Sequence, residues 1–304
     1  MILSNCISTV CAKGGVGKTT LSAHIAGLAA NSGWSVLAVD LDPSGNLAPT
    51  LGFRDRSDWG EHLLRACTGE ADALEPVWDV RPLLDVVAGG PAVAELGEWL
   101  RSNEQAGVSG GLDRLGEVLA PLCARYDLVV VDLPPGEAVV QEAALRFSRF
   151  VLIPSDGDTC SNDGIALLYR HILAARDVNP MLEVLGVVLM FVPAGASALL
   201  REYRGELDDL LQGKVRVFDE TIRHAKRAAK DCRKKGLLAH EYGDAKRQAL
   251  PWYRAKQLGR PPERFAENAD GLAHDYQRLV EAVLDAAVAS REAERVAEAQ
   301  VAAR

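Results

Sequence analysis

Lysine is scarce in this sequence. The 304 residues include nine lysines against twenty-five arginines. Two of the nine are Lys13 and Lys18, and the other seven all lie between Lys214 and Lys256. Because an ammonium group is a common ligand of phosphate, this distribution indicates phosphate binding near the N-terminus and a second anionic ligand near the lysine-rich stretch.

Long apolar runs and paired cysteines are also absent. No apolar run approaches the roughly 18–20 residues that span a bilayer, and residues 1–11 lack the charged start of a cleaved signal. The six cysteines are scattered, without a C-x-x-C pair, which predicts reduced thiols in a cytosolic protein. With 48% hydrophobic residues, the chain can bury a substantial core.

The first two lysines belong to a glycine-rich stretch, which reads KGGVGKTT over residues 13–20. It follows a β-branched run that ends at Val10, and it precedes apolar residues at helical spacing, Leu21, Ile25 and Leu28. A strand, a glycine-rich turn and a helix in this order are the context of a phosphate-binding loop. The backbone amides and the helix N-terminus would surround an anion.

The chemistry of such a loop assigns roles to individual residues. Lys18 would neutralise the β- and γ-phosphates, and the Thr19 hydroxyl would reach Mg²⁺. The usual loop has glycine where this chain has Ala12, and it lacks the surplus cation Lys13. The residues predicted to bind ATP here are Lys13, Gly14, Gly15, Val16, Gly17, Lys18, Thr19 and Thr20.

Three carboxylates are expected beside this loop. Asp40 and Asp42 lie where an apolar run over 36–40 ends, and Asp132 ends a second run over 128–131. A hydrophobic strand that ends in Asp beside a phosphate loop usually holds a Mg²⁺ water. The alternative for each Asp is a cap on the following helix or turn. We favour the first interpretation and predict a metal site at Thr19, Asp40 and Asp132.

Short β-rich runs alternate with amphipathic helical patterns. The further strands are predicted over residues 36–40, 83–88, 127–132, 150–154 and 184–192. This alternation predicts a doubly wound α/β fold, a mostly parallel sheet with helices on both faces, followed by a helical C-terminal extension. We divide the chain into an ATPase domain (1–243), a basic strap and C-terminal helix packed on it (244–290), and a tail (291–304) that is a protruding helix or disordered.

The sequence resembles a known family at three places in the expected order. Residues 12–20, 40–46 (DLDPSGN) and 132–136 (DLPPG) are similar to the deviant Walker A, A′ and B motifs of the ParA/MinD ATPases. The resemblance covers roughly residues 3–243. It implies a P-loop NTPase fold and an ATP-bound dimer that acts as a switch, with slow hydrolysis that a partner protein stimulates.

The resemblance also implies roles for side chains. Lys13 matches the lysine that reaches the partner's nucleotide in the dimer, and Asp42 matches the carboxylate that positions the attacking water. With Lys18 these are the predicted catalytic residues. Adenine is expected near Pro154 and Asp156, in the loop that continues to Asp158. Two departures from the family are Ser44, which is commonly Gln, and Arg223, which is often Pro close to the base.

Residues 214–264 are strongly basic. They hold fifteen Lys/Arg and six Asp/Glu, a local charge of +9 in a chain of net charge −8, so the remainder carries −17. If residues 223–234 are helical, several of these cations share one face, which suits a phosphate backbone better than base reading. The alternatives are a solvated face, an acidic protein or lipid headgroups. The predicted DNA-binding residues are Arg223, Lys226, Arg227, Lys230, Arg233, Lys234 and Lys235.

A second cationic segment, 246–264, includes Trp252 and Tyr253, which we expect to pack on the body. A membrane-binding relative of the MinD type would need a bulky amphipathic terminal helix. The last thirteen residues offer only Val296 and Val301 as branched apolar side chains, so we predict no membrane contact. Iron–sulfur relatives need paired cysteines near the dimer axis, which are not placed here.

Together these features predict a ParA-type ATPase with ATP and Mg²⁺ as cofactors. It would form an ATP-bound homodimer, bind non-specific double-stranded DNA and associate with the nucleoid in the cytoplasm. Its task would be to position a plasmid, a chromosome region or a protein body with a ParB-like or other adaptor. The alternative is a MinD-like or otherwise protein-tethered positioning ATPase that does not bind DNA.

Overall fold

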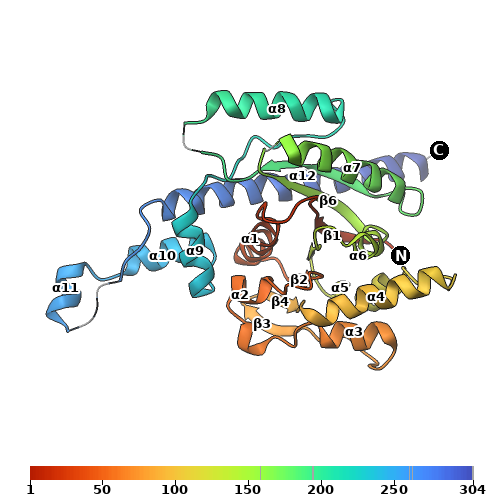
Figure 1. Ribbon diagram of the computed structural model, residues 1–304, viewed down its shortest axis with the longest axis horizontal. Helices are drawn as coiled ribbons and strands as arrows, with labels where there is room; N and C mark the ends of the chain where they lie inside the picture. Colours follow the sequence, from red (N-terminus) through yellow and green to blue (C-terminus); the bar gives the residue numbers. More distant parts are fainter. Residues whose placement is uncertain (158, 194, 260, 262, 303–304) are drawn as a thin grey trace.

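A seven-stranded sheet forms the centre of the protein (Figure 1). The computed structural model describes residues 1–157, 159–193, 195–259, 261 and 263–302, without the side chains of 159–163, 252, 298, 301 and 302. The strands are β1 (Leu3–Thr9), β2 (Val36–Asp40), β3 (Val77–Arg81), β4 (Leu84–Val87), β5 (Leu128–Asp132), β6 (Ser148–Ser155) and β7 (Glu183–Leu189). Their order is β3-β4-β2-β5-β1-β6-β7, and only the β3–β4 pair is antiparallel.

Helices cover both faces of this sheet. Those on one face are α1 (Lys18–Asn31), α2 (Leu47–Leu51), α9 (Lys226–Lys235), α10 (Ala239–Gln248) and α12 (Ala269–Ala302). Those on the other face are α3 (Glu61–Thr68), α4 (Pro91–Gln105), α5 (Arg114–Cys123), α6 (Ala138–Leu145), α7 (Thr159–Ala175) and α8 (Ser197–Leu211). The short helix α11 (Trp252–Gln257) lies at the outer end of the molecule, away from the sheet (Figure 1).

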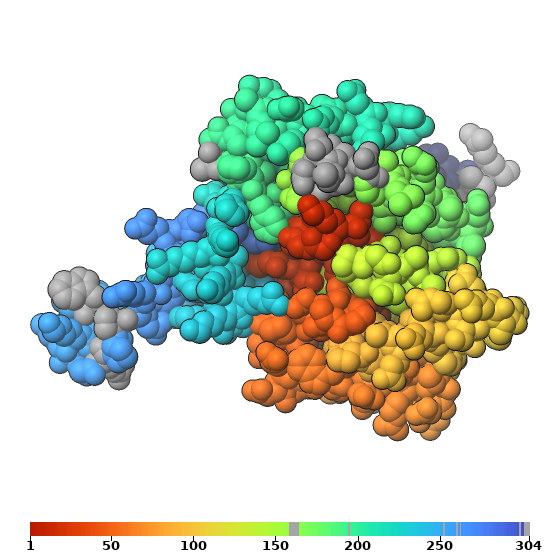
Figure 2. Space-filling model, in the orientation of Figure 1, coloured from red at the N-terminus to blue at the C-terminus, as the bar shows by residue number. Residues whose placement is uncertain are grey.

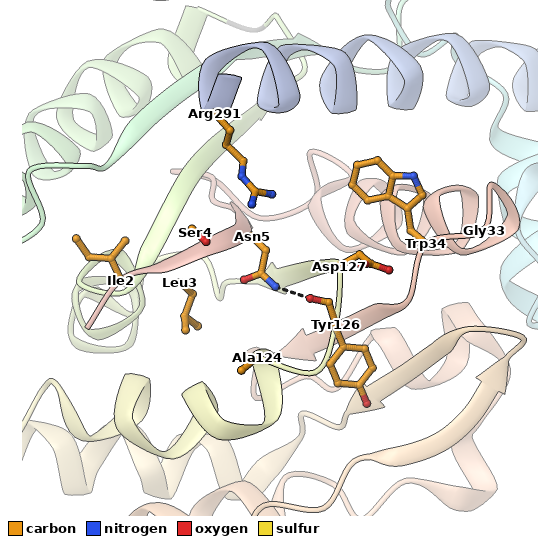
Figure 3. A pocket seen from close by; sticks show the side chains of 10 residues that line it. All are labelled: Ile2, Leu3, Ser4, Asn5, Gly33, Trp34, Ala124, Tyr126, Asp127 and Arg291. Atoms are coloured by element: carbon orange, nitrogen blue, oxygen red, sulfur yellow. Dashed lines mark hydrogen bonds between the residues drawn. The ribbon is translucent and has the colours of Figure 1, made fainter. Parts of the chain in front are cut away.

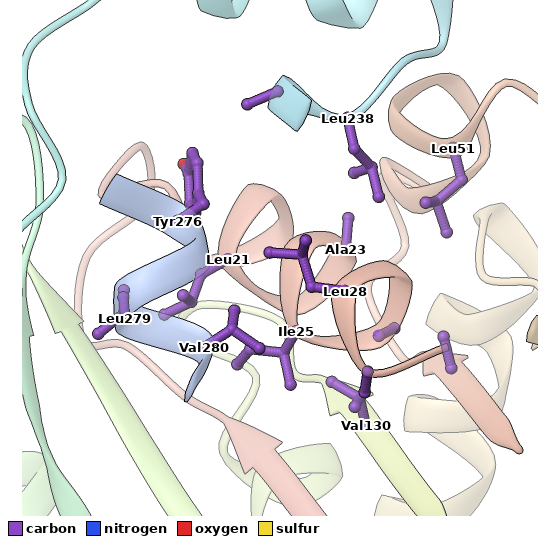
Figure 4. Close-up of a cluster of buried hydrophobic side chains, with 14 of the residues drawn as sticks. Leu21, Ala23, Ile25, Leu28, Leu51, Val130, Leu238, Tyr276, Leu279 and Val280 are labelled. Atoms are coloured by element: carbon purple, nitrogen blue, oxygen red, sulfur yellow. The ribbon is translucent and has the colours of Figure 1, made fainter. Parts of the chain in front are cut away.

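Two apolar cores follow from the alternation of side chains along buried strands. In β2, Val36 and Ala38 belong to one core, whereas Leu37 and Val39 belong to the other. Figure 4 shows the first core, where Leu21 and Ile25 of α1 lie between α12 and the sheet. The prediction of a doubly wound, mostly parallel sheet with helices on both faces and a helical C-terminal region is confirmed.

One strand differs from the sequence expectation, and the C-terminal tail adopts the helical one of its two expected alternatives. Strand β3 was not predicted, because it is a short, partly exposed edge strand that pairs antiparallel with β4. The C-terminal helix runs on to Ala302 without a break at residue 291. The buried Arg149 holds it there, through an ion pair of 2.7 Å to Glu294 and a hydrogen bond of 3.3 Å to Ser290.

His24 fixes α1 against two later segments. Its Nδ1–H donates to the carbonyl of Thr20, and its Nε2 accepts from the backbone N–H of Ala239 at 3.0 Å. Its ring stacks on Tyr276 of α12, with centroids 3.6 Å apart. Both ring nitrogens are therefore used by the neutral tautomer, and burial lowers the pKa of His24 to about 3.

This low pKa makes His24 a source of acid sensitivity. A histidine that titrates near 6.5 when unfolded but near 3 when folded contributes stability above pH 6.5 that is lost as pH falls. Lowering the pH from 7 to 5 should therefore cost about 2 kcal/mol through His24 alone. We expect His24→Gln to lack this share of the pH dependence of urea unfolding. His62→Gln, at an exposed position, is the matched control, and equal pH dependence in both variants would contradict the account.

Candidate nucleotide site and the neighbouring cationic helix

The glycine-rich loop lies between β1 and α1, at the carboxyl edge of the sheet. Gly15 and Gly17 have φ of 88° and 87°, in the left-handed region that favours glycine. A Cβ on Gly17 would lie 2.8 Å from the Phe191 ring and 2.9 Å from the Met190 methyl. The loop therefore needs glycine at position 17 both for its backbone conformation and for its close packing on the segment after β7.

Ala12 packs against a glycine of α7, Gly164. A Cβ built on Gly164 of α7 would come to 2.7 Å from the Ala12 Cβ. The methyl group at position 12, where a glycine is usual, thus occupies the space that Gly164 leaves open. No local sequence pattern connects the two positions, because they are brought together only by the packing of α7.

The side chain of Lys18 is buried beside the loop, next to two carboxylates. Its Nζ is 2.7 Å from Asp132 Oδ1 and 3.4 Å from Asp42 Oδ2, and its side chain is 5% exposed. Burial on its own would lower the pKa of Lys18, but the charge and hydrogen bond of Asp132 and the charge of Asp42 outweigh it, so the pKa is raised. The lysine therefore stays charged, as phosphate binding requires.

Asp132 collects several donors besides Lys18. Thr19 Oγ1 donates to Asp132 Oδ2 at 2.7 Å, and Ser22 Oγ donates to Oδ1 at 2.9 Å. Thr9 Oγ1 donates to the same Oδ1 at 3.3 Å. The Thr19 hydroxyl and the Asp132 carboxylate form a pair of hard oxygen ligands next to the loop, which fits Mg²⁺, an ion that takes few protein ligands and keeps waters and phosphate oxygens. Ser22 and Thr9 were not predicted from the sequence.

Asp40 is held differently from the other two carboxylates. Its Oδ1 accepts from the backbone N–H of Asp42, and its Oδ2 accepts from that of Leu47, both at 3.0 Å. It pairs in register with Asp132 on the neighbouring strand. Burial and the charge of Asp132 raise the pKa of Asp40 to about 8. In this geometry both oxygens shape the loop after β2, so the predicted contribution to Mg²⁺ rests on Asp132 and Thr19 more than on Asp40.

Asp42 lies between Lys18 and the next turn of the chain. Its Oδ1 accepts from the backbone N–H of Ser44 at 2.9 Å and from the Ser44 hydroxyl at 2.6 Å. Ser44 Oγ in turn accepts from Asn46 Nδ2 at 2.6 Å. The structure therefore places Asp42 beside the predicted phosphate site, in a hydrogen-bonded loop that the sequence did not predict.

The surplus cation Lys13 lies at the surface of the loop. Its Nζ is 3.8 Å from Asp156, which follows β6, and its side chain is 48% exposed. Pro154 is buried within β6. Asp158 lies outside the described residues. The structure thus brings Asp156 to the loop on the side of Lys13, whereas Pro154 pairs with Val188 inside the sheet.

A groove of about 570 Å³ adjoins the other end of the loop at Thr20. Its wall includes Phe191, Ile222 and His224, which the sequence did not single out as a set. Parallel bridges join β7 and the segment after it to the segment before α9. They lie between Val187 and Val217 and between Val192 and Arg223. The groove is also lined by four cations, Arg223, Lys226, Lys230 and Arg233. It therefore combines cations with an aromatic and apolar wall of the kind that a purine ring contacts.

A second hollow, of about 730 Å³, lies at the opposite edge of the sheet (Figure 3). Leu3 and Asn5 at the start of β1, Trp34 before β2 and Asp127 before β5 line it, together with Arg291 of α12. These positions are at the amino ends of the strands, whereas ligands of open α/β sheets bind beyond the carboxyl ends. We therefore do not place the nucleotide there.

Helix α9 carries the exposed cations of the basic stretch. Four cations are exposed, and none of their side chains has a hydrogen bond or ion pair to another residue that the structure describes; they are Lys226, Arg227, Lys230 and Lys234. Of the other two, Arg233 donates to Asn46, and Lys235 pairs with Glu263 at 3.1 Å. In Figure 2 the surface of α9 adjoins that of the segment after β2, on the face where the glycine-rich loop opens.

Arg223 does not belong to this helical face. The expectation of one helix over 223–234 is wrong at its start, because α9 begins at Lys226 and Arg223 is in extended chain. Its guanidinium pairs with Asp275 of α12 at 2.6 Å and 2.8 Å. The Asp275 pair and the bridge to Val192 hold the backbone at this position.

The second cationic segment, 246–264, is partly neutralised by ion pairs, and its helix α11 lies away from the sheet. Lys246 and Arg247 both pair with Asp270, at 2.8 Å and 3.0 Å. Tyr253 is 50% exposed on α11, so the expected packing of Tyr253 on the body is wrong. The side chain of Trp252 lies outside the described residues. No helix in the described part of the chain is both long and apolar enough to cross a membrane.

Comparisons with known proteins agree with this geometry. Residues 4–184 match the AAA domain family. The chromosome partitioning protein ParA of Myxococcus xanthus is 32% identical over 209 residues, which cover 66% of this chain and 70% of that protein.

Solved structures share the fold. McdA of Cyanothece in complex with ATP is 19% identical and superposes over 87% of this chain and 100% of that one, with a TM-score of 0.67. A plasmid partition protein of Borrelia burgdorferi bound to AMPPNP is 16% identical and superposes over 94% and 99%, with a TM-score of 0.66. From its motifs, fold and relatives, this chain belongs to the ParA/MinD-type family of P-loop ATPases.

Proposed function

We propose that this chain is a partition-type ATPase whose ATP-bound dimer binds non-specific DNA and positions a cargo. One observation carries the proposal. The phosphate loop and the unneutralised cations of α9 are joined by the short segment from Asp42 to Leu51, which contacts both. A nucleotide site and a polyanion-binding surface are thereby built on one rigid unit, so the state of one can affect the other.

In this proposal the loop binds ATP through its amides, Lys18 and Thr20, and Thr19 and Asp132 hold Mg²⁺. Bound Mg²⁺ would supply charge neutralisation at the phosphates. Lys18 is already charged and positioned by Asp132, so it meets the phosphates without reorganisation. The base lies in the groove along Phe191, which replaces the position near Pro154 and Asp156 expected from the sequence. Asp42 orients the attacking water.

Dimerisation is assigned to the face around Lys13. A cation on an exposed loop, 3.8 Å from a carboxylate of its own chain, can exchange that partner for the phosphates of a second subunit. Its charge would then stabilise the transition state in the dimer, much as an arginine finger does. The acidic remainder of the chain, at −17 beside the +9 segment, would attract a basic adaptor peptide. The partitioning relatives suggest a plasmid, a chromosome region or a protein body as cargo.

The catalytic assignment of Asp42 can be tested by Asp42→Ala. Loss of a group that orients the nucleophile should lower kcat for ATP by about 10²-fold or more, with ATP binding retained through the loop and Lys18. Steady-state phosphate release and equilibrium ATP binding measure the two effects separately. Turnover at the wild-type rate would remove Asp42 from the reaction.

The DNA assignment can be tested by charge reversal at Lys226, Arg227 and Lys230. Replacing all three with Glu should abolish detectable duplex binding near physiological salt, because each contact with a phosphate is lost. At low salt, the slope of log Kd against log salt should fall by about 3. Because Lys226 and Lys230 also line the groove along Phe191, ATP affinity is measured in the same variant and duplex binding is compared at saturating ATP.

The matched control reverses the same total charge elsewhere. Arg65, Arg201 and Arg295 are exposed on α3, α8 and α12. Their triple Glu variant should bind duplex DNA with nearly the wild-type salt slope. Equal loss in both variants would mean that α9 is an ordinary solvated face and that only the net charge matters.

A further inference from the structure

A cationic cavity of about 740 Å³ lies between α9 and the segment that follows β2. Five cations contribute to its wall, with one carboxylate, Asp55, and one aromatic ring, Trp59. The cations are Arg54, Lys230, Arg233, Lys234 and Lys235. Such a concentration of one charge around a hollow is favourable only when an anion or counterions share it.

The cavity has the features of a phosphate site. Arginine and lysine side chains present many N–H donors without acceptors. Among the charged groups of the wall, Arg54 lies 5.6 Å over the Trp59 ring, and Lys235 is partly neutralised by Glu263. Lys230 and Lys234 have no ion pair within the described part of the chain. A phosphate would therefore meet preformed donors without first breaking strong pairs at these two residues.

The walls of the cavity are fixed to each other. Gly52 and Gly236 touch so closely that a Cβ on Gly236 would lie 2.4 Å from the Gly52 Cα. Arg81 also ties both sides, because it donates to the carbonyls of Leu51 and Gly236 and pairs with Glu241 of α10. Because α9 is clamped in this way, a ligand in the cavity acts by moving side chains rather than the helix.

One side chain of the wall is connected to the catalytic loop. Arg233 Nη2 donates to Asn46 Oδ1, and Asn46 Nδ2 donates to Ser44 Oγ at 2.6 Å. Ser44 Oγ has a single hydrogen, and since it accepts from Asn46 it donates that hydrogen to Asp42 Oδ1 at 2.6 Å. In this series of three hydrogen bonds every donor points toward Asp42, so the hydrogen bonds polarise one another.

These contacts occupy Asp42. Its Oδ1 accepts from both the N–H and the hydroxyl of Ser44, and its Oδ2 lies 3.4 Å from Lys18. The side chain is only 11% exposed. Asp42 Oδ2 keeps room for one more donor, but three donors already share the charge of the carboxylate, so it holds an attacking water more weakly than a carboxylate with fewer partners would. The Ser44 hydroxyl is the one that can rotate away, once Asn46 no longer directs it.

We propose that the cavity between α9 and the Asp42 loop binds phosphate, and that phosphate draws Arg233 from Asn46 and thereby frees Asp42 for hydrolysis. Arg233, Asn46 and Ser44 are then positioning residues that act through Asp42. The effect on turnover rests on the proposed catalytic role of Asp42, whereas phosphate binding in the cavity does not. The phosphate can belong to a duplex backbone or to a free polyphosphate, and the experiment separates these sources.

Binding is measured on the full chain saturated with Mg²⁺ and a non-hydrolysable ATP analogue, the state in which the duplex is proposed to bind. Tripolyphosphate or a 20-base-pair duplex is titrated while tryptophan emission is recorded, and the share due to Trp59 is the part lost in Trp59→Phe. We expect a saturable Trp59-dependent change with tripolyphosphate. The affinity for tripolyphosphate should fall several-fold both in Arg233→Gln and in Lys234→Gln. A change with the duplex alone would assign the cavity to the DNA backbone.

Coupling is measured as kcat at saturating ATP, because competition of tripolyphosphate at the glycine-rich loop would raise KM only. The probe should raise wild-type kcat about tenfold, the size expected for release of one charged hydrogen bond. Arg233→Gln and Asn46→Ala should turn over at the raised rate without the probe and respond no further. Lys234→Gln removes the same charge from the same wall but has no bond to Asn46, so it should keep the response, and Arg233→Lys should restore part of it.

Several results would overturn the inference. The absence of any Trp59-dependent change with either probe would exclude the phosphate site, even if the duplex binds by fluorescence anisotropy. Equal kcat responses in Arg233→Gln and Lys234→Gln, or a wild-type response in Asn46→Ala, would exclude the connection to Asp42. If instead no duplex binds in any nucleotide state but tripolyphosphate gives both effects, the DNA-binding proposal fails and the cavity remains a site for a free phosphate ligand.

Discussion

The burial of one ammonium group organises this protein. Lys18 is 5% exposed, and a charge so far from water is stable only when it is paired and hydrogen-bonded. Its partners come from two other parts of the chain, Asp132 at the end of β5 and Asp42 in the loop after β2. The glycine-rich loop, β5 and the segment after β2 must therefore close on one another before the site exists, and the order of the strands, with β5 between β1 and β2, provides this.

The loop that carries Asp42 is also attached to α9. Asp42 is fixed on one side by Lys18 and on the other by Ser44, and the following residues pass into α2, which Arg81 and the Gly52–Gly236 contact hold against α9. A cationic helix is thereby attached to the loop that faces the nucleotide. In the family match, residues 4–184 include the nucleotide motifs but not α9, so the DNA proposal depends on this chain's own charges and packing.

Local patterns sufficed for the strands other than β3, for the glycine-rich loop and for the carboxylates, because each is encoded by neighbouring residues. Asp40 and Asp132 could be named because each ends an apolar run, and Asp42 because the resemblance implied its role. Contacts between distant segments could not be read in this way. The fit of Ala12 on Gly164, the groove along Phe191 and the pair Arg223–Asp275 all depend on packing that joins residues far apart. The start of α9 was misplaced because Arg223 shares the charge of the helix but not its backbone.

The most direct test of the account is the binding of non-specific duplex DNA with ATP, with ADP and without nucleotide, over a series of salt concentrations. The account predicts binding with ATP only, which weakens steeply as salt rises because phosphate contacts release counterions. Binding that is independent of nucleotide would contradict the coupling of the two sites. The absence of binding in every state, with ATP still hydrolysed, would contradict the DNA assignment and make α9 a surface for another partner.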